Sequence, residues 1–491
     1  MHIYYMSSEV VPFSKTGGLA DVAGMLPNEI ARLGHQATVI TPYYRATKKL
    51  EPKPKLVAEG HVPVGPAQET WSLYHSAAKG PAKVYFIGCD KYFDRDGLYG
   101  TAQGDYEDSC SRFVFFSRAC IAAAQALKEP IDIWHCHDWQ TALVPPYLKF
   151  LFAGQPFCEN ARTVFTIHNL AYQGVFWHWD WPLLNLPWQH FNWRELEFHG
   201  KMNLLKGALV HANILTTVSP TYAKEVQTPA FGCGLEGVLQ ARKDSLVGIV
   251  NGIDVLAWDP RKDALLPATY DAQDLSGKKV CKTVLRRHFN LPDDNTVVLG
   301  MIGRLFEQKG FDLVAQQIED MLKRNIQVVV LGTGREEFHK LLQRMQQLNP
   351  QRIAVAFAFD NSLAHLIEAG SDIFLMPSRY EPCGMNQLYS LKYGTPPIVH
   401  SVGGLADTVT HATPETLANG TATGFCFQDY SPRALLACID RALRMFEKEP
   451  ENWKKLQLTG MSQDWSWSNS AKQYIAIYER VLAGGAAKQK S

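Results

Sequence analysis

Basic residues beside glycines occur at two places where they could bind a phosphate. The first is the segment KTGGL at 15–19, between a short apolar run at 3–6 and a helical pattern at 19–33. Adjacent glycines let a ligand approach the backbone, the first amides of a helix lack intrahelical partners, and a lysine adds positive charge. We expect a phosphate or an anionic leaving group there, although a plain glycine-rich turn with a surface lysine remains an alternative. The spacing matches neither the phosphate loop of nucleotide hydrolases nor the dinucleotide fingerprint.

The second basic segment is GRLFEQKG at 303–310, which follows a predicted strand at 297–302. Arg304 can grip phosphate oxygens in a bidentate manner, and Lys309 supplies a point charge on a long stem. Two such cations can neutralise a diphosphate. The alternative is a solvated basic loop without a ligand.

A carboxylate follows another predicted strand, at 373–376. The segment PSRYEPCGMNQ at 377–387 contains Glu381, and Cys383-Gly384 is predicted to open a helix. Such a helix start would offer amides to a phosphate, while Glu381 can accept hydrogen bonds from sugar hydroxyls. A helix cap is the alternative role for Glu381.

These motifs need a scaffold that brings strand ends together. The apolar pattern alternates between short β-branched runs and longer helical stretches, which is typical of parallel sheets with crossover helices, and it does so twice. We predict strands at 3–6, 37–41, 84–87, 131–135, 162–167, 214–218, 297–302, 326–331, 353–357, 373–376 and 397–399. Doubly wound domains bind ligands at the carboxyl ends of their strands. The predicted fold class is therefore α/β, with two doubly wound Rossmann-like domains facing a central cleft.

The join between the two halves lies near NGID at 251–254, a turn signal followed by a polar, proline-containing stretch. We predict an N-terminal domain at 1–252 and a C-terminal domain at 253–465. The segment 466–484 is predicted to form a helix that returns to the N-terminal domain, because its apolar residues share one face. The tail at 485–491 is predicted to be disordered.

The composition excludes several function classes. The 491 residues, 46% hydrophobic and 20% charged, suffice for two large domains. A net charge of +1 indicates no nucleic-acid partner. Apolar runs far shorter than the roughly 20 residues of a membrane span indicate no membrane partner. Ten scattered cysteines without metal-ligand spacing indicate reduced thiols in a cytosol-like compartment. The first strand begins directly after Met1, so we expect no targeting segment or one already removed.

Taken together, the motifs resemble those of the bacterial glycogen synthases and plant starch synthases (glycosyltransferase family 5). The resemblance covers almost the whole chain and rests on the three segments above together with SE at 8–9, HCHDW at 135–139, TIHNLAYQG at 166–174 and VNGID at 250–254. It implies a retaining glycosyltransferase of the two-domain GT-B type. Such an enzyme transfers glucose from ADP-glucose to the non-reducing end of an α-1,4-glucan, namely glycogen, starch or a maltooligosaccharide. The implied cofactor set is empty: ADP-glucose is a substrate, and no metal is expected.

The resemblance also implies roles for individual residues. Arg304 and Lys309 would stabilise the departing diphosphate, which is transition-state stabilisation. Asp138 would hold glucose hydroxyls, His168 would lie near the anomeric centre, and Glu381 would orient the glucose ring. The implied donor-binding residues are Lys15, Gly18, Asp21, Asn251, Phe359, Cys383 and Gly384.

Three positions depart from the family pattern or define its branch. Phe359 stands where relatives commonly place a tyrosine that stacks on adenine, and stacking needs the ring rather than the hydroxyl. Asn386 replaces a frequent threonine, which leaves details of the donor pocket open. Tyr389 occupies the place of a second glutamate found in the wider superfamily, as is usual in the starch and glycogen synthase branch.

Other polar and aromatic segments have two interpretations each. Trp177 and Trp179, in the tryptophan-rich segment 174–197, suit a glucan-binding surface or a packed loop. The sequence DRD at 94–96 resembles a metal-binding pair but is followed by glycine, which favours a turn. His135 and His137 have spacing two and could bind a metal, or they could be satisfied by packing within a strand.

The function predicted from all of this is an ADP-glucose-dependent glucan synthase in a bacterial-type cytoplasm, with a processed plastid form left open. One alternative is a GT-B relative that uses UDP-glucose or another acceptor. Another is a catalytically silent glucan-binding protein. A phosphorylase is disfavoured because no motif identifies a pyridoxal phosphate lysine.

Overall fold

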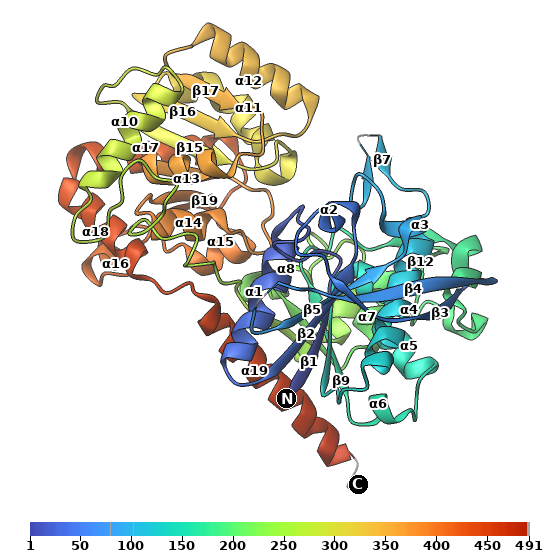
Figure 1. The fold of residues 1–491 in the computed structure, drawn as a ribbon. Helices are drawn as coiled ribbons and strands as arrows, with labels where there is room; N and C mark the ends of the chain where they lie inside the picture. The colour runs from blue at the N-terminus through green and yellow to red at the C-terminus, as the bar shows by residue number, and fades with distance from the viewer. Residues whose placement is uncertain (79, 102, 489–491) are drawn as a thin grey trace. The chain divides into compact units, whose positions relative to one another are not determined.

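In a computed structural model, which describes residues 1–78, 80–101 and 103–488, the chain forms two compact units (Figure 1). Unit 1 contains Met1–Val218, Ala223–Gly252 and the chain from Trp467 onward. Unit 2 contains Ser219–Tyr222 and Ile253–Ser466. The chain therefore crosses between units at the NGID segment and again before its last helix. The short excursion at 219–222 was not predicted.

Unit 1 is built on a sheet with the order β14-β13-β9-β8-β1-β2-β5-β4-β3. The strands from β14 to β5 run parallel, and β4 and β3 extend the sheet as an antiparallel hairpin. The strands of this sheet are β1 His2–Met6, β2 Gln36–Pro42, β3 Lys55–Val64, β4 Ala67–His75, β5 Lys83–Gly88, β8 Ile133–His137, β9 Arg162–Ile167, β13 Ile214–Thr217 and β14 Leu246–Gly248. Two small sheets contain β6 Gly100–Thr101 with β7 Gly104–Asp105, and β10 Val175–Trp177 with β11 Glu197–Phe198 and β12 Lys201–Asn203.

One face of this sheet is covered by α1 and by α19, which lie side by side (Figure 1). Apolar residues of both helices pack on β1, β2, β8, β9 and β13, so the end of the chain completes the core of unit 1. The helices of unit 1 are α1 Gly18–Arg32, α2 Arg45–Lys48, α3 Asp90–Phe93, α4 Ser109–Leu127, α5 Val144–Phe150, α6 Pro156–Glu159, α7 Leu204–His211, α9 Glu236–Ala241 and α19 Trp467–Lys488, with short 3-10 turns η1 Trp139–Thr141, η2 His178–Leu184, η3 Trp188–His190 and η4 Lys243–Ser245. The helix α8 Pro220–Glu225 has its first residues assigned to unit 2 and its last to unit 1.

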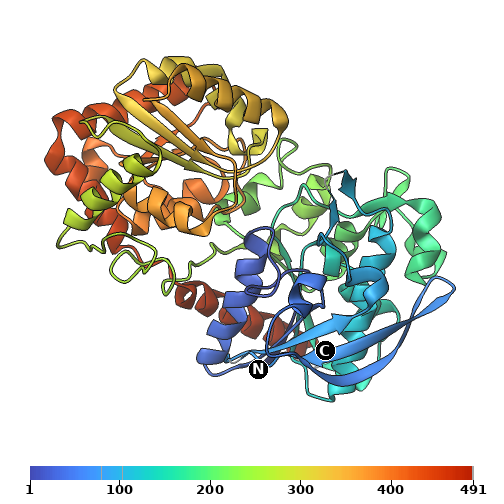
Figure 2. The ribbon, with the colours of Figure 1, turned by 45° about the horizontal axis from the view of Figure 1, so that its top comes forward.

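Unit 2 is a parallel sheet with the order β17-β16-β15-β18-β19-β20, and helices cover both of its faces (Figure 2). Its strands are β15 Val297–Ile302, β16 Ile326–Leu331, β17 Ile353–Ala356, β18 Ile373–Met376, β19 Pro397–His400 and β20 Phe425–Phe427. Its helices are α10 Ser276–His288, α11 Phe311–Leu322, α12 Glu336–Leu348, α13 Asn361–Gly370, α14 Asn386–Lys392, α15 Gly403–Thr408, α16 Pro414–Ala418, α17 Pro432–Lys448 and α18 Pro450–Ser462, with the 3-10 turn η5 Glu307–Lys309.

Each sheet has one point where the strand order reverses. In unit 1 the chain winds outward from β1 through β2 and β5, and in the other direction from β8 through β9 and β13. In unit 2 the same reversal separates β15 from β18, and the order within the unit is that of a Rossmann fold. The loops on the two sides of such a point diverge, which opens a crevice at the carboxyl ends of the strands. The candidate site residues should therefore lie after β1 and β8, and after β15 and β18.

The structure corrects several predicted elements. β8 covers 133–137 rather than 131–135, because its two histidines are buried and continue the strand. The β3–β4 hairpin was missed, since only two residues of β3 are buried and the strand lacks a clear apolar alternation. The last helix continues to 488, so part of the tail predicted to be disordered is helical, and 489–491 lie outside the described residues. In the described part of the chain, none of the ten cysteines forms a disulfide. Within the described residues, no helix combines the length and apolar character that crossing a bilayer requires.

Candidate active site

Asp138 and His168 meet next to the reversal point of unit 1. Asp138 follows β8 and His168 follows the neighbouring strand β9, and both are buried. Asp138 Oδ1 accepts a hydrogen bond of 2.8 Å from the backbone N–H of His168. The structure therefore brings together the two residues that the sequence placed at the reacting sugar.

The backbone of Asp138 is strained. Its φ of 55° and ψ of −179° lie in a region that is almost exclusive to glycine. A non-glycine residue there costs about 1–3 kcal/mol, and such residues cluster at active sites. The strain directs the carboxylate toward the loop after β9, where it binds the amide of His168.

The surroundings of Asp138 disfavour its charged form. Burial raises the pKa of Asp138 to about 7, and the backbone amides of His168 and Asn169 oppose this shift only in part. The negative charge of Glu9 adds to the increase in the pKa. A carboxyl group with this pKa is partly protonated near neutral pH, so it can accept hydrogen bonds from hydroxyl groups or donate one to them.

His168 is held by a second buried histidine. His137 Nδ1 lies 3.0 Å from His168 Nε2. Burial lowers the pKa of His168 to about 3 and also lowers that of His137, so both rings are neutral at physiological pH. His137 is thus a support for the predicted catalytic residue, and sequence analysis gave it no such role.

The glycine segment after β1 begins α1 as predicted, but its backbone is already partly occupied. Lys15 Nζ donates to Asp21 Oδ1 at 2.7 Å, so the two predicted donor-binding residues form an ion pair. The carboxylate of Glu9 accepts hydrogen bonds from the amides of Thr16 and Gly17. A ligand anion would therefore meet the first-turn amides from Gly18 onward, with Lys15 beside them.

Glu9 belongs to the motif SE at 8–9, and the sequence predicted no individual role for it. Tyr99 donates to Glu9 Oε1 at 2.6 Å, and its hydroxyl also lies 2.8 Å from Ser8 Oγ. These contacts fix the loop after β1. The position of Glu9 directly after the first strand is the signal that could have identified it.

Lys309 and Glu381 meet at the reversal point of unit 2. Lys309 Nζ donates to Glu381 Oε2 at 2.6 Å, and Ser378 Oγ donates to the same oxygen at 3.0 Å. Glu381 is buried, whereas Lys309 keeps part of its side chain exposed. The ammonium group has three donors, so the pairing leaves it able to bind an anion as well.

Arg304 lies in the same loop as Lys309 and is exposed. Its guanidinium donates a long hydrogen bond of 3.4 Å to Gln308 Oε1 and lies 5.7 Å from the centroid of the Phe306 ring. The loop is fixed by Gly310, whose φ of 78° is left-handed. A side chain at Gly310 would also collide with the carbonyl of Pro377, only 2.0 Å from the added carbon. The close approach binds the loop after β15 to the loop after β18.

The helix predicted to open at Cys383-Gly384 begins at Asn386 instead. Gly384 has a φ of 74°, which a right-handed helix does not accept, and its carbonyl and that of Cys383 accept hydrogen bonds from Gln387 Nε2. Asn386 Nδ2 donates to the carbonyl of Ile302 at 2.8 Å, which joins the start of α14 to the end of β15. The phosphate-binding role of Gly384 stays a prediction.

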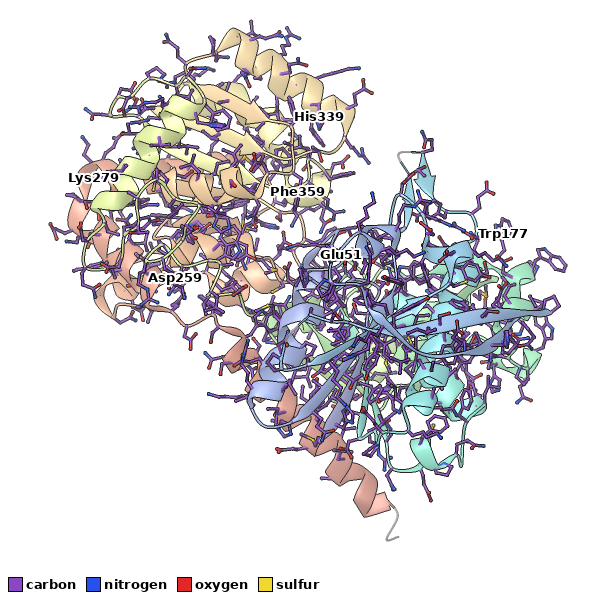
Figure 3. All side chains as sticks on the ribbon, in the orientation of Figure 1. Glu51, Trp177, Asp259, Lys279, His339 and Phe359 are labelled. Atoms are coloured by element: carbon purple, nitrogen blue, oxygen red, sulfur yellow. The ribbon has the colours of Figure 1, made fainter. Side chains whose placement is uncertain are left out.

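Phe359 lies in the loop after β17 and is 91% exposed (Figure 3). A free aromatic ring at a strand end is available for stacking on a base. Asn251 follows β14 at the outer edge of the other sheet and is buried. Within the part of the chain that the structure describes, no group is hydrogen-bonded to Asn251 Oδ1.

The tryptophan-rich segment fits both of its interpretations, residue by residue. Trp181 is fully buried and packs against Trp188, with ring centroids 5.8 Å apart. Trp177 is 62% exposed and Trp179 is 78% exposed, and Figure 3 labels the former on β10. Lys201 Nζ lies 5.3 Å above the ring of Trp177. Trp181 thus anchors the segment, while the other two rings face solvent.

The DRD segment forms ion pairs. Arg45 binds both Asp94 and Asp96 at 2.6 Å, and Lys48 also contacts Asp94. Arg95 pairs with Asp108. This network favours the turn interpretation, because positive side chains occupy the carboxylates.

Comparisons with known proteins place the chain in one family. Residues 2–241 match the starch synthase catalytic domain, and residues 283–456 match the group 1 glycosyl transferases. A glycogen synthase of Koribacter versatilis is 48% identical over 98% of both chains, and one of Anaeromyxobacter sp. is 47% identical over 98% of this chain and 100% of its own.

Solved structures agree with these sequence matches. The catalytic domain of starch synthase IV from Arabidopsis thaliana, bound to ADP and acarbose, superimposes with a TM-score of 0.88 at 31% identity. That match covers 98% of this chain and 99% of the other. A sucrose-phosphate synthase from Thermosynechococcus elongatus, at 18% identity and a TM-score of 0.60, shares the fold. The fold is therefore GT-B, and the chain belongs to the family of bacterial glycogen synthases and starch synthases.

Proposed function

We propose that this chain is a retaining glucosyltransferase that transfers glucose from ADP-glucose to the non-reducing 4-hydroxyl of an α-1,4-glucan. One observation carries the proposal. In each doubly wound unit the side chains proposed to act meet at strand ends at or next to the reversal point: Asp138 and His168 after β8 and β9 of unit 1, and Lys309 and Glu381 after β15 and β18 of unit 2. The 48% identity to a named glycogen synthase over almost the whole chain supports it.

The cations of unit 2 would act on the leaving group. Arg304 and Lys309 both follow β15, and a departing nucleoside diphosphate gains negative charge as its bond to glucose breaks. Positive charge fixed there stabilises the transition state more than the ground state. Lys15 would contribute a further positive charge from the glycine segment of unit 1. Because these residues supply the charge, we propose that the reaction needs no metal and no other cofactor.

The buried carboxyl groups would orient the sugar. Glu381 has one oxygen engaged by Lys309 and Ser378, which leaves the other able to accept from a glucose hydroxyl. Asp138 would hold hydroxyls in the same manner, with neutral His168 near the anomeric carbon. A neutral ring avoids repulsion with the positive charge that develops at that carbon.

The nucleotide would be recognised by stacking and backbone contacts. The exposed ring of Phe359 would lie on the adenine, and Gly384 would donate its amide to a phosphate. Gly18, Asp21, Asn251 and Cys383 complete the proposed donor set. Stacking tolerates several bases, so a relative that uses UDP-glucose is the second candidate.

The glucan acceptor would extend over the exposed tryptophans of unit 1. Trp177 and Trp179 present flat apolar rings to solvent, and such rings pack well on sugar faces. Because these residues are not needed for the chemical step, Trp179→Ala should weaken binding of glycogen and leave transfer to maltotriose nearly unchanged. Affinity electrophoresis in glycogen-containing gels measures the first, and initial rates measure the second.

The decisive experiment compares ADP-glucose and UDP-glucose as donors for glucose incorporation into glycogen, with a metal chelator present. Lys309→Ala should abolish transfer. Lys323→Ala is the matched control, because Lys323 belongs to the same unit and pairs with Asp320 on an exposed helix end. Digestion of the labelled product by an exo-acting α-1,4-glucan hydrolase tests retention of configuration.

The outcomes separate the candidates. Chelator-resistant transfer from ADP-glucose, lost in Lys309→Ala alone, supports the proposal. Transfer only from UDP-glucose supports the second candidate, and no transfer from either donor with retained glycogen binding supports a silent glucan-binding protein. We also propose a cytoplasmic location, as expected for an enzyme that consumes a nucleotide sugar, and fractionation of the source cells tests it. A processed plastid form is the other location.

A further inference from the structure

A buried chain of hydrogen bonds runs from the last helix of the protein into the sheet of unit 1. The hydroxyl of Tyr478, on α19, lies 2.8 Å from His135 Nδ1 and 3.1 Å from the hydroxyl of Tyr5. His135 Nε2 lies 2.6 Å from Thr166 Oγ1, which lies 2.6 Å from Thr216 Oγ1. All five side chains are fully buried.

The chain of hydrogen bonds crosses four neighbouring strands. Its members come from β1, β8, β9 and β13, which are adjacent in the sheet, and α19 supplies the one member from outside the sheet. Burying polar groups is costly unless each finds a partner, so the five groups stabilise the fold only as a complete set. Buried networks of this kind hold their members in one arrangement.

The imidazole of His135 is in turn the support of the site histidine. Its ring stacks on that of His137, with centroids 4.2 Å apart and an interplanar angle of 30°. His137 Nδ1 then contacts His168 Nε2 at 3.0 Å. Tyr478, His135, His137 and His168 therefore form a continuous buried column from α19 to the site.

The hydrogen-bond partners of His137 indicate where the protons of the two site histidines lie. His137 Nε2 is buried and finds no hydrogen-bond partner among the described residues. An orphaned N–H costs more than an orphaned acceptor, so the proton of His137 belongs on Nδ1, from which it donates to His168 Nε2. His168 then carries its own proton on Nδ1.

We propose that Tyr478 is a positioning residue for glucosyl transfer: it fixes the ring of His135, which stacks on His137, and His137 in turn holds the site residue His168 through a ring-nitrogen hydrogen bond. The helix that closes the core of unit 1 thereby also sets the orientation of a residue that lies about three hundred positions earlier in the sequence. This inference rests on the proposed function for its kinetic consequence, but its structural consequence can be measured without any activity.

The test replaces Tyr478 by phenylalanine, which keeps the ring and removes the hydroxyl. Tyr147→Phe is the matched control, because Tyr147 is equally buried in unit 1 and donates to the carbonyl of Leu184 instead. Thr216→Val removes the opposite end of the hydrogen-bond chain and replaces Tyr478→Phe if that variant does not fold. Each variant is compared by kcat, by KM for ADP-glucose, by thermal unfolding and by histidine ring ¹⁵N NMR.

We expect Tyr478→Phe to lower kcat about tenfold with KM within about twofold, because displaced groups at a reacting centre lose rate rather than binding. The His168 ring signals should show an Nδ1–H tautomer in the wild type and should shift or broaden in Tyr478→Phe, but not in Tyr147→Phe. Equal kcat in the two variants, or unmoved His168 signals, would overturn the inference. If the wild type transfers no glucose, the proposed function fails, and the NMR comparison still tests whether Tyr478 positions His168.

Discussion

The ionised carboxyl group of Asp138 should lower the free energy of unfolding at neutral pH and above, and a side chain that cannot ionise should raise it again. Asp138→Asn keeps an oxygen that can accept from the amide of His168, with nearly the same volume, but cannot ionise. The folded protein raises the pKa of this group from 3.8 to about 7. A raised pKa means that the folded state binds the proton more tightly than the unfolded state does.

The sign and size follow from linkage. The stabilising contribution of protonated Asp138 is fully present below pH 3.8, is lost as the pH rises toward 7, and stays lost above it. A shift of about three pKa units corresponds to about 4 kcal/mol at pH 8. Asparagine cannot ionise, so the variant Asp138→Asn does not lose this stability as the pH rises. Its free energy of unfolding should therefore exceed that of the wild type by under 1 kcal/mol at pH 4 and by about 4 kcal/mol at pH 8.

Thermal unfolding at a series of pH values measures this difference. For a unit of this size, about 4 kcal/mol corresponds to a Tm higher by about 10 °C at pH 8. Glucosyl transfer should fall at least about a hundredfold in the same variant, because the carboxylate no longer holds the sugar. The comparison of variant with wild type cancels the other groups that titrate over this range.

A control with the opposite sign is available in the same unit. Arg45 and Lys48 lower the pKa of Asp94, so its contribution to stability is present at neutral pH and lost as the pH falls. Asp94→Asn should therefore be less stable than the wild type at pH 8 and approach it in acid. A stability difference for Asp138→Asn that does not change between pH 5 and pH 8 would refute the reasoning.

Three further predictions concern packing and the donor site. Gly310→Ala should lower the free energy of unfolding in urea by more than about 1 kcal/mol and abolish transfer. The φ of Gly310 is 78°, and the new methyl group would overlap the carbonyl of Pro377. An unchanged urea midpoint would contradict this. Phe359→Ala should raise the KM for ADP-glucose about tenfold or more without changing Tm, since stacking on a base is worth about 1–3 kcal/mol and the ring is 91% exposed, whereas Phe359→Tyr should keep the wild-type KM. Trp181→Ala should cost about 3–5 kcal/mol in chemical denaturation, against less than about 0.5 kcal/mol for Trp179→Ala, because only Trp181 is buried; equal losses would mean that the segment packs differently.

The sequence alone determined the alternation of strands and helices and the loops that carry the chemistry. The loops after β1, β15 and β18 were identified because strand ends coincide with changes from apolar to polar or glycine residues, and those after β8 and β9 were identified by the resemblance to the family. The helix predicted from residue 19 was found for the same reason, and α1 begins at Gly18. These are local signals, which depend on the order of residues rather than on what lies opposite them.

Only the tertiary structure decided which residues support the site. His135 and His137 had a spacing compatible with a metal site, and their actual partners, Tyr478 and His168, lie far away in the sequence. Glu9 likewise owes its role to the loop that folds over it. Spacing in a strand shows which side chains share a face, but not which groups of other strands and helices reach that face. Such partners become visible once the sheet order is known, because packing joins segments that the sequence keeps apart.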